Sequence, residues 1–61
     1  MNNYVIEYEI ENVLTGNRSA RRRTFNPIPA ESKYNAVALL AQRIGENDSI
    51  IVDIYSVEEI N

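Results

Sequence analysis

A chain of 61 residues that contains neither cysteine nor histidine has to hold its fold by packing alone. No disulfide, thiolate or zinc site with nitrogen and sulfur ligands can stabilise it, and catalysis by imidazole is excluded as well. A chain this short has room for one core, so we expect residues 1–61 to form a single domain that uses nearly all of its apolar side chains. With 44% hydrophobic and 25% charged residues, it has the composition of a globular domain.

Two strands and a turn are predicted in the first half of the chain. Apolar and polar residues alternate from Tyr4 to Ile10, which is typical of a half-buried strand with Glu7 and Glu9 on its polar side. Gly16-Asn17 suits a hairpin turn. A second strand is expected at 19–25, at an edge of the sheet because it is rich in arginine, and the prolines at 27 and 29 end it.

A helix and a last strand are predicted in the second half. The helix begins within 29–32, with Pro29 in its first turn or Ser32 as N-cap, and ends at Gly45 in a left-handed C-cap. Leu39 lies opposite its apolar stripe, which comprises Ala30, Tyr34, Val37, Ala38, Leu40, Ala41 and Ile44. The last strand covers 49–57. Strict alternation divides it into a face with Ile50, Val52 and Ile54 and a face with Ile51, Asp53, Tyr55 and Val57.

This order of elements predicts an α+β fold of the ββαβ type. A right-handed crossover places the last strand beside the first, so the three-stranded antiparallel sheet has the order 2-1-3. The single helix covers one face, and the other face is left to solvent or to a partner. The side of the second strand that faces inward stays open, because Phe25 and Ala20 favour opposite registers.

The run from Arg18 to Arg23 contains four of the six basic residues, namely Arg18, Arg21, Arg22 and Arg23. Guanidinium groups bind nucleic-acid phosphates, so this run is a candidate phosphate-binding hairpin. The alternative is that Arg21 and Arg23 pair with Glu7 and Glu9 and protect the sheet edge. The net charge of −3 favours the alternative, because proteins that depend on phosphate contacts are usually basic.

A candidate protein-binding patch lies on the uncovered sheet face. Strict alternation places Ile51, Tyr55 and Val57 there with Val5, bordered by Asp53, Glu7 and Glu9. The alternative is that these side chains are ordinary surface residues or lean over the edge of the core. Homodimerisation through the same face is a third interpretation.

Catalytic residues, a cofactor and a metal site are not expected. Glu7 and Glu9 share one side of a strand, but such a pair is usually solvated or salt-bridged. Gly16 and Gly45 stand alone, so there is no glycine-rich phosphate loop, and no carboxylate spacing matches a calcium loop. The apolar runs are too short to cross a bilayer and no signal peptide precedes them, so we expect a cytoplasmic protein without membrane contact.

A pattern of apolar positions runs from Arg23 to the end of the last strand. It comprises Arg23-x-Phe25, Ala30-x-Ser32, Ala38-x-x-Ala41 and Ile50-x-Val52-x-Ile54-x-x-Val57-x-Glu59-Ile60. This spacing resembles that of very small bacteriophage and mobile-element proteins, such as phage inhibitors of bacterial RNA polymerase. The resemblance implies a short sheet with one helix, and an inhibitor that occludes a host enzyme or defence complex by stoichiometric binding. An acidic surface is compatible with that mode, and the arginine run departs from it.

Together these observations predict a non-enzymatic protein-binding module, with a bacterial nucleic-acid-processing enzyme as the candidate partner. Tyr55, Ile51 and Val57 would be its apolar anchors, and Asp53 with the Arg18–Arg23 run would set orientation. The alternatives are a nucleic-acid-binding hairpin domain and a small structural subunit that forms oligomers.

Overall fold

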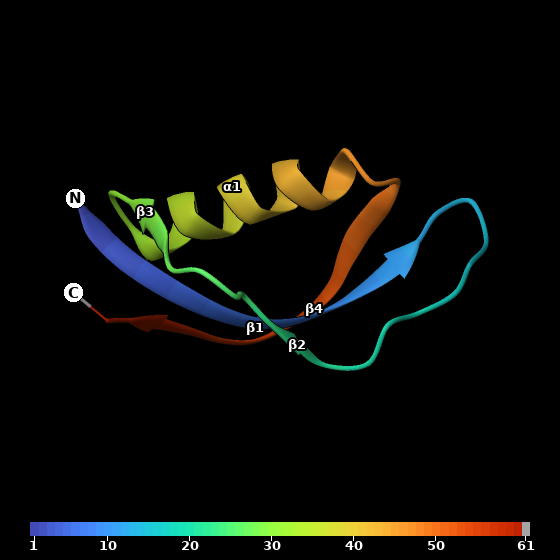
Figure 1. Cartoon of the computed structure of the whole chain (residues 1–61), viewed down its shortest axis with the longest axis horizontal. Coiled ribbons are helices and arrows are strands. Elements are labelled where there is room, and N and C mark those ends of the chain that lie inside the picture. The colour runs from blue at the N-terminus through green and yellow to red at the C-terminus, as the bar shows by residue number, and fades with distance from the viewer. Residues whose placement is uncertain (61) are drawn as a thin grey trace.

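The computed structural model describes residues 1–60, which form four strands and one helix. The elements are β1 (Asn2–Asn12), β2 (Arg22–Arg23), β3 (Ile28–Ala30), α1 (Lys33–Gly45) and β4 (Ser49–Glu59). The helix lies across one face of a curved sheet in which β1 and β4 are the long strands (Figure 1). The predicted α+β fold with one helix is confirmed.

The sheet is built around β1. Strand β4 pairs with one edge of β1 from Tyr4 to Asn12, while β2 and β3 share the other edge at different points along it. All of these pairings are antiparallel. The predicted sheet order, with the first strand in the centre, is therefore confirmed.

The predicted second strand, 19–25, is longer than β2 at both ends, and the predicted three-stranded ββαβ sheet lacks the additional strand β3. Only Arg22 and Arg23 form β2, and the chain pairs with β1 again at β3 after a loop. Pro29 therefore lies in an edge strand and not in the helix. Because the outer edge of this strand faces solvent, the missing N–H of Pro29 costs no hydrogen bond of the sheet. Neither Ala20 nor Phe25 faces the core, since both are exposed.

The helix begins where the Ser32 alternative predicted. The Ser32 hydroxyl oxygen accepts a hydrogen bond from the backbone N–H of Asn35 at 3.1 Å, which satisfies one of the free donors of the first turn. The helix ends at Gly45, but the predicted left-handed C-cap there is wrong: Asp48, with φ of 58°, adopts that conformation three residues later. Gly16, with φ of 77°, supports the predicted turn after β1.

One core lies between α1 and the sheet. Its fully buried centre is Ile6 of β1 and Ile28 of β3, and the other buried members are Tyr4, Tyr8, Ala30, Ala36 and Leu40. The helix contributes Ala36 and Leu40, with Val37 and Ile44 half-buried beside them. Tyr34, Ala38 and Ala41, which the predicted stripe included, are exposed. The predicted apolar stripe is therefore too wide, and the buried face of the helix is centred on Ala36.

Two β-bulges change which residues of β4 face the core. The register with β1 shifts between Glu7 and Tyr8 and again between Glu9 and Ile10, so that Tyr55 and Val52 have no directly opposed residue. Each extra residue reverses the alternation of the strand. As a result Ile51, Ile54 and Val57, spaced by three, all pack against the core.

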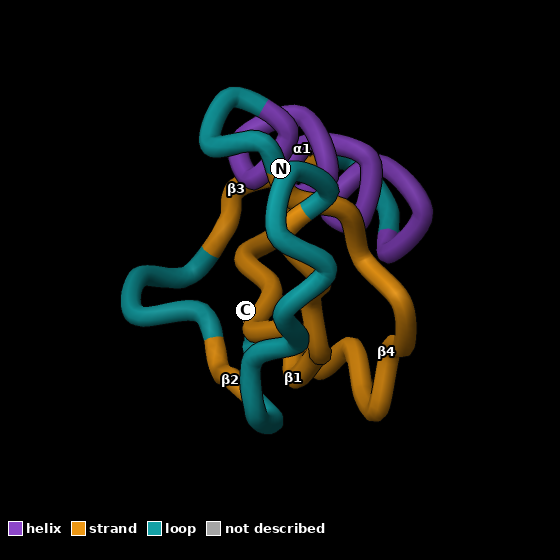
Figure 2. Tube along the Cα trace, turned by 90° about the vertical axis from the view of Figure 1, so that its right-hand side faces the viewer, coloured by secondary structure: helices purple, strands orange, loops and turns teal. Residues whose placement is uncertain are grey.

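In the described part of the chain, the other face of the sheet carries no helix, and the loop between β2 and β3 projects from its edge (Figure 2). We call this face, opposite α1, the open face. Along residues 1–60, no helix has both the length and the apolar character needed to cross a membrane.

Candidate functional site

The open face carries a row of carboxylates along β1, formed by Glu7, Glu9 and Glu11. These side chains alternate with the inward-facing Tyr8 and Ile10, so they project from the same side of the strand. Each carboxylate contacts a polar or basic side chain from a neighbouring part of the chain. The alternation that buries one side of β1 therefore builds a charged row on the other.

Glu7 is the centre of the largest group on this face. Its carboxylate lies 3.4 Å from Arg21 Nε and 3.8 Å from Arg23 Nη1, and it accepts a hydrogen bond from the Ser56 hydroxyl at 3.0 Å. Arg23 also lies 3.8 Å from Glu58 of β4. These contacts connect the β2 side of the sheet to β4 across the central strand.

The other two carboxylates have one main partner each. The Tyr55 hydroxyl donates a hydrogen bond to Glu9, and the guanidinium of Arg21 lies over the Tyr55 ring at 4.4 Å from its centroid. Arg18 Nε donates to Glu11 at 3.0 Å, and this contact raises the pKa of Arg18 above its ordinary value. The stacked guanidinium is an attractive arrangement, because the ring face is electron-rich.

Of the four arginines predicted to bind a partner, Arg18, Arg21 and Arg23 therefore lie on the open face and pair with carboxylates of their own sheet. This agrees with the edge-protection interpretation, with Glu11, Glu7 and Glu58 as the carboxylate partners. The predicted ion pair with Glu9 is wrong, because within residues 1–60 Glu9 bonds to Tyr55 and no arginine pairs with it. Each pair is exposed, so it adds little to the free energy of unfolding. A nucleic-acid phosphate would have to compete with these carboxylates for the same guanidinium groups.

The hydrogen bond to Glu9 makes Tyr55 a reporter of the open face. It raises the pKa of Tyr55 above the ordinary tyrosine value, with desolvation and the nearby carboxylates acting in the same direction. Because the pKa of Tyr55 is higher in the folded state, the hydrogen bond to Glu9 stabilises the fold at pH values below the pKa of Tyr55 in the unfolded state. This stabilisation is lost as the pH rises through the pKa of Tyr55 in the folded state.

We expect Glu9→Gln to lower the pKa of Tyr55, measured by NMR titration of its ring carbons. A Tyr55 pKa that is the same in both proteins would show that the Glu9 contact does not form in solution.

Two of the predicted apolar anchors are not on this face. Ile51 and Val57 pack against the core, because the bulges at Val52 and Tyr55 turn them inward. Tyr55 and Asp53 remain exposed, and Tyr55 is already engaged by Glu9 and Arg21. The predicted placement of Ile51 and Val57 on the open face is therefore wrong, and Val5, the other apolar member of the predicted patch, is buried. The open face is mainly a charge-paired polar surface on which Tyr55 and Asp53 lie as predicted.

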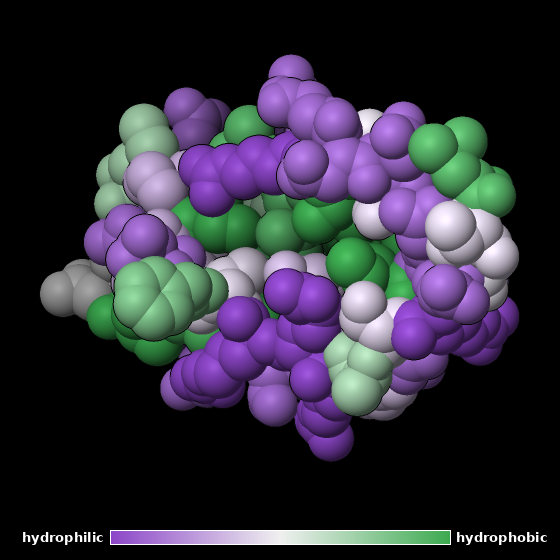
Figure 3. Space-filling view, turned by 45° about the vertical axis from the view of Figure 1, so that its right-hand side comes forward, coloured by the Kyte–Doolittle hydropathy of each residue, from purple (hydrophilic) through white to green (hydrophobic). Residues whose placement is uncertain are grey.

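The fourth arginine lies on the other side of the sheet. Arg22 is opposite Tyr8 in the register of β1 and β2, whereas Arg23 is opposite Glu7. It lines a hollow between the sheet and the end of α1. Figure 3 shows hydrophobic side chains at the floor of a hollow that hydrophilic side chains border above and below.

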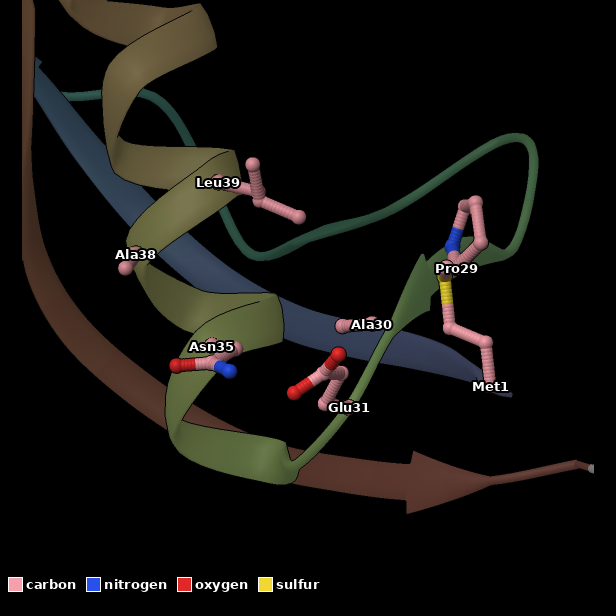
Figure 4. Close-up of a pocket in the computed structure, with 7 residues that line it drawn as sticks. All are labelled: Met1, Pro29, Ala30, Glu31, Asn35, Ala38 and Leu39. Carbon is pink, nitrogen blue, oxygen red and sulfur yellow. The ribbon is translucent and has the colours of Figure 1, made fainter.

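An apolar surface that strand alternation did not predict lies where β3 meets α1. A groove of about 310 Å³ is formed there, with Asn35, Ala38 and Leu39 of the helix on one side and β3 on the other (Figure 4). The remaining lining residues are Met1, Pro29, Ala30 and Glu31. The sequence feature that pointed to this groove is Leu39, an apolar residue on the side of the helix opposite the predicted apolar stripe. We call this surface the β3–α1 groove.

Comparisons of this chain with protein-family models, with curated proteins and with solved structures found no match. Among residues 1–60, no group of three or more acidic, histidine or cysteine side chains is placed to hold a metal ion.

Proposed function

We propose that this chain is a non-enzymatic protein-binding module, whose apolar contacts are Phe25 and the β3–α1 groove. The observation that carries the proposal is the exposure of Phe25, a residue that is 97% accessible to solvent. An aromatic ring displayed in this way loses its hydration only when a partner covers it. Aromatic side chains supply much of the binding energy at protein interfaces.

The loop that presents Phe25 is anchored on both sides. Before it, the Thr24 hydroxyl accepts a hydrogen bond from the Ile6 N–H at 3.1 Å, and the Thr24 N–H donates to the Ile6 carbonyl oxygen at 3.0 Å. After it, Ile28 is completely buried in the core. The exposed ring therefore belongs to a short projecting loop (Figure 2) with fixed ends, which lowers the ordering cost of binding.

The composition of β3 favours docking through side chains over the addition of a partner strand. Pro29, in the middle of this short strand, has no N–H to offer a neighbouring strand. Its ring lines the β3–α1 groove instead. The apolar side chain of a partner is the kind of group that the groove accommodates.

The proposed role is that of a small phage- or plasmid-type regulator that occludes a bacterial nucleic-acid-processing enzyme. The chain has a net charge of −3, and after Arg43 it contains five acidic residues and no basic one. An acidic molecule is attracted to enzymes whose channels are basic, and this attraction raises the encounter rate. Asp53 and the paired charges of the open face would then set the orientation of the complex.

Capture of the tagged protein from a bacterial lysate, after nuclease treatment, tests this role. We expect one stoichiometric protein partner, which Phe25→Ala releases and the control Leu14→Ala retains, because Leu14 is also exposed but lies in the β1–β2 loop. Equal retention by both variants would remove Phe25 from the interface. Retention of nucleic acid, or loss of the partner on nuclease treatment, would favour the arginine hairpin as a nucleic-acid-binding element.

A further inference from the structure

A second hollow, of about 350 Å³, lies at the other end of α1 from the β3–α1 groove. Its walls come from the sheet, from the last turn of the helix and from the turn that follows it. The lining residues are Tyr8, Ile10, Arg22, Ile44, Asn47 and Ser49. We call it the Arg22 pocket.

Arg22 differs from the arginines on either side of it. Arg21 and Arg23 both contact Glu7 on the open face, whereas Arg22 points to the helix side and has no carboxylate partner within residues 1–60. The cause is strand alternation, which sends neighbouring residues of β2 to opposite faces. The guanidinium at this pocket is therefore free to bind an anion from outside.

Tyr8 supplies a second polar group that has no partner within residues 1–60. The residue is only 8% exposed, and its hydroxyl has no hydrogen-bond partner among the described residues. The hydroxyl is not sealed in the core either, because within residues 1–60 no buried side-chain polar atom lacks a partner. It therefore reaches accessible space, and the space that Tyr8 lines is the Arg22 pocket.

The surroundings of these two groups indicate the charge and shape of a ligand. Ile10, Ile44 and the Tyr8 ring form apolar walls, while Asn47 and Ser49 add polar groups beside Arg22. One guanidinium balances one negative charge, and the nearby helix C-terminus, which carries partial negative charge, disfavours a dianion. The planar guanidinium matches a carboxylate in two parallel hydrogen bonds.

We propose that the Arg22 pocket binds a short aliphatic carboxylate, with Arg22 pairing with the carboxylate, Tyr8 donating a hydrogen bond to it and the two isoleucines contacting the aliphatic part. This chemistry occurs in a free organic acid and in the acidic side chain of another protein. The site does not depend on the protein-binding role proposed above, because it uses different residues.

NMR titration of the ¹⁵N-labelled full chain tests the proposal at constant ionic strength. Sodium propionate represents the free acid, and a terminally blocked Gly-Glu-Gly peptide represents the protein side chain. We expect saturable shifts in the millimolar range at the amides of Tyr8, Asn47 and Ser49 and at the Arg22 side chain. Arg22→Gln should abolish saturation, Tyr8→Phe should weaken binding several-fold, and Arg23→Gln, on the opposite face, should leave it unchanged.

The two probes also identify the source of the carboxylate. Tighter binding of the blocked peptide than of propionate assigns the pocket to an acidic side chain, and the reverse order assigns it to a free acid. Shifts that rise linearly without saturation, or that persist in Arg22→Gln, would overturn the proposal. So would inorganic phosphate or the matching Gly-Gln-Gly peptide binding as well as the carboxylates.

Discussion

Ile6→Ala is expected to leave the protein largely unfolded at room temperature. Ile6 is fully buried between the sheet and α1, and truncating such a side chain costs about 2–5 kcal/mol in lost burial and in the cavity left behind. A single core in a chain of this size rarely supplies more than about 3–5 kcal/mol in total. The loss therefore approaches the whole free energy of unfolding.

Urea denaturation followed by far-ultraviolet circular dichroism measures this loss. Leu14→Ala is the matched control, since Leu14 is an aliphatic residue with 76% of its surface exposed. The control should unfold within about 0.5 kcal/mol of the natural sequence. Equal stability of the two variants would contradict the placement of Ile6 at the centre of the core.

Val57→Asn is expected to destabilise the protein by about 2 kcal/mol, while Ile50→Asn costs less than about 1 kcal/mol. Val57 packs against the core opposite Ile6, whereas Ile50 is 49% exposed. Strict alternation of β4 predicts the reverse order, with Ile50 on the core face. The pair of variants therefore tests the two bulges directly, by the same denaturation measurement.

A larger loss in Ile50→Asn than in Val57→Asn would mean that β4 pairs with β1 without the bulges. Amide hydrogen exchange offers an independent check on the same strand. Val52 and Tyr55 have no directly opposed residue in β1, and such irregular points in a ladder exchange faster than their neighbours.

The fold was largely predictable because its strongest signals are local. Alternation from Tyr4 to Ile10 identified the central strand, and Ser32 and Gly45 marked the two ends of the helix. The bulges could not be predicted, since they depend on how β4 pairs with a strand more than forty residues away in sequence. One extra residue at Tyr55 is enough to exchange the two faces of the strand.

The candidate sites were predictable only in part, for the same reason. The pairing of Arg21 and Arg23 with Glu7 followed from placing the two strands side by side. The exposure of Phe25 did not, because it requires the chain to leave the sheet after Arg23 and return at Ile28. The prolines at 27 and 29 indicate that the strand is interrupted after Phe25, but they do not indicate in which direction the loop projects.

The pairing of β1 with β4 has a consequence for how the protein is made. The first strand of the chain finds its longest partner in the last one, with Tyr4 opposite Glu59. During synthesis on the ribosome, β1 must therefore wait for β4 to emerge before its sheet can close. Such long-range closure slows folding. Until then, the apolar side of β1 is exposed to chaperones and to other nascent chains.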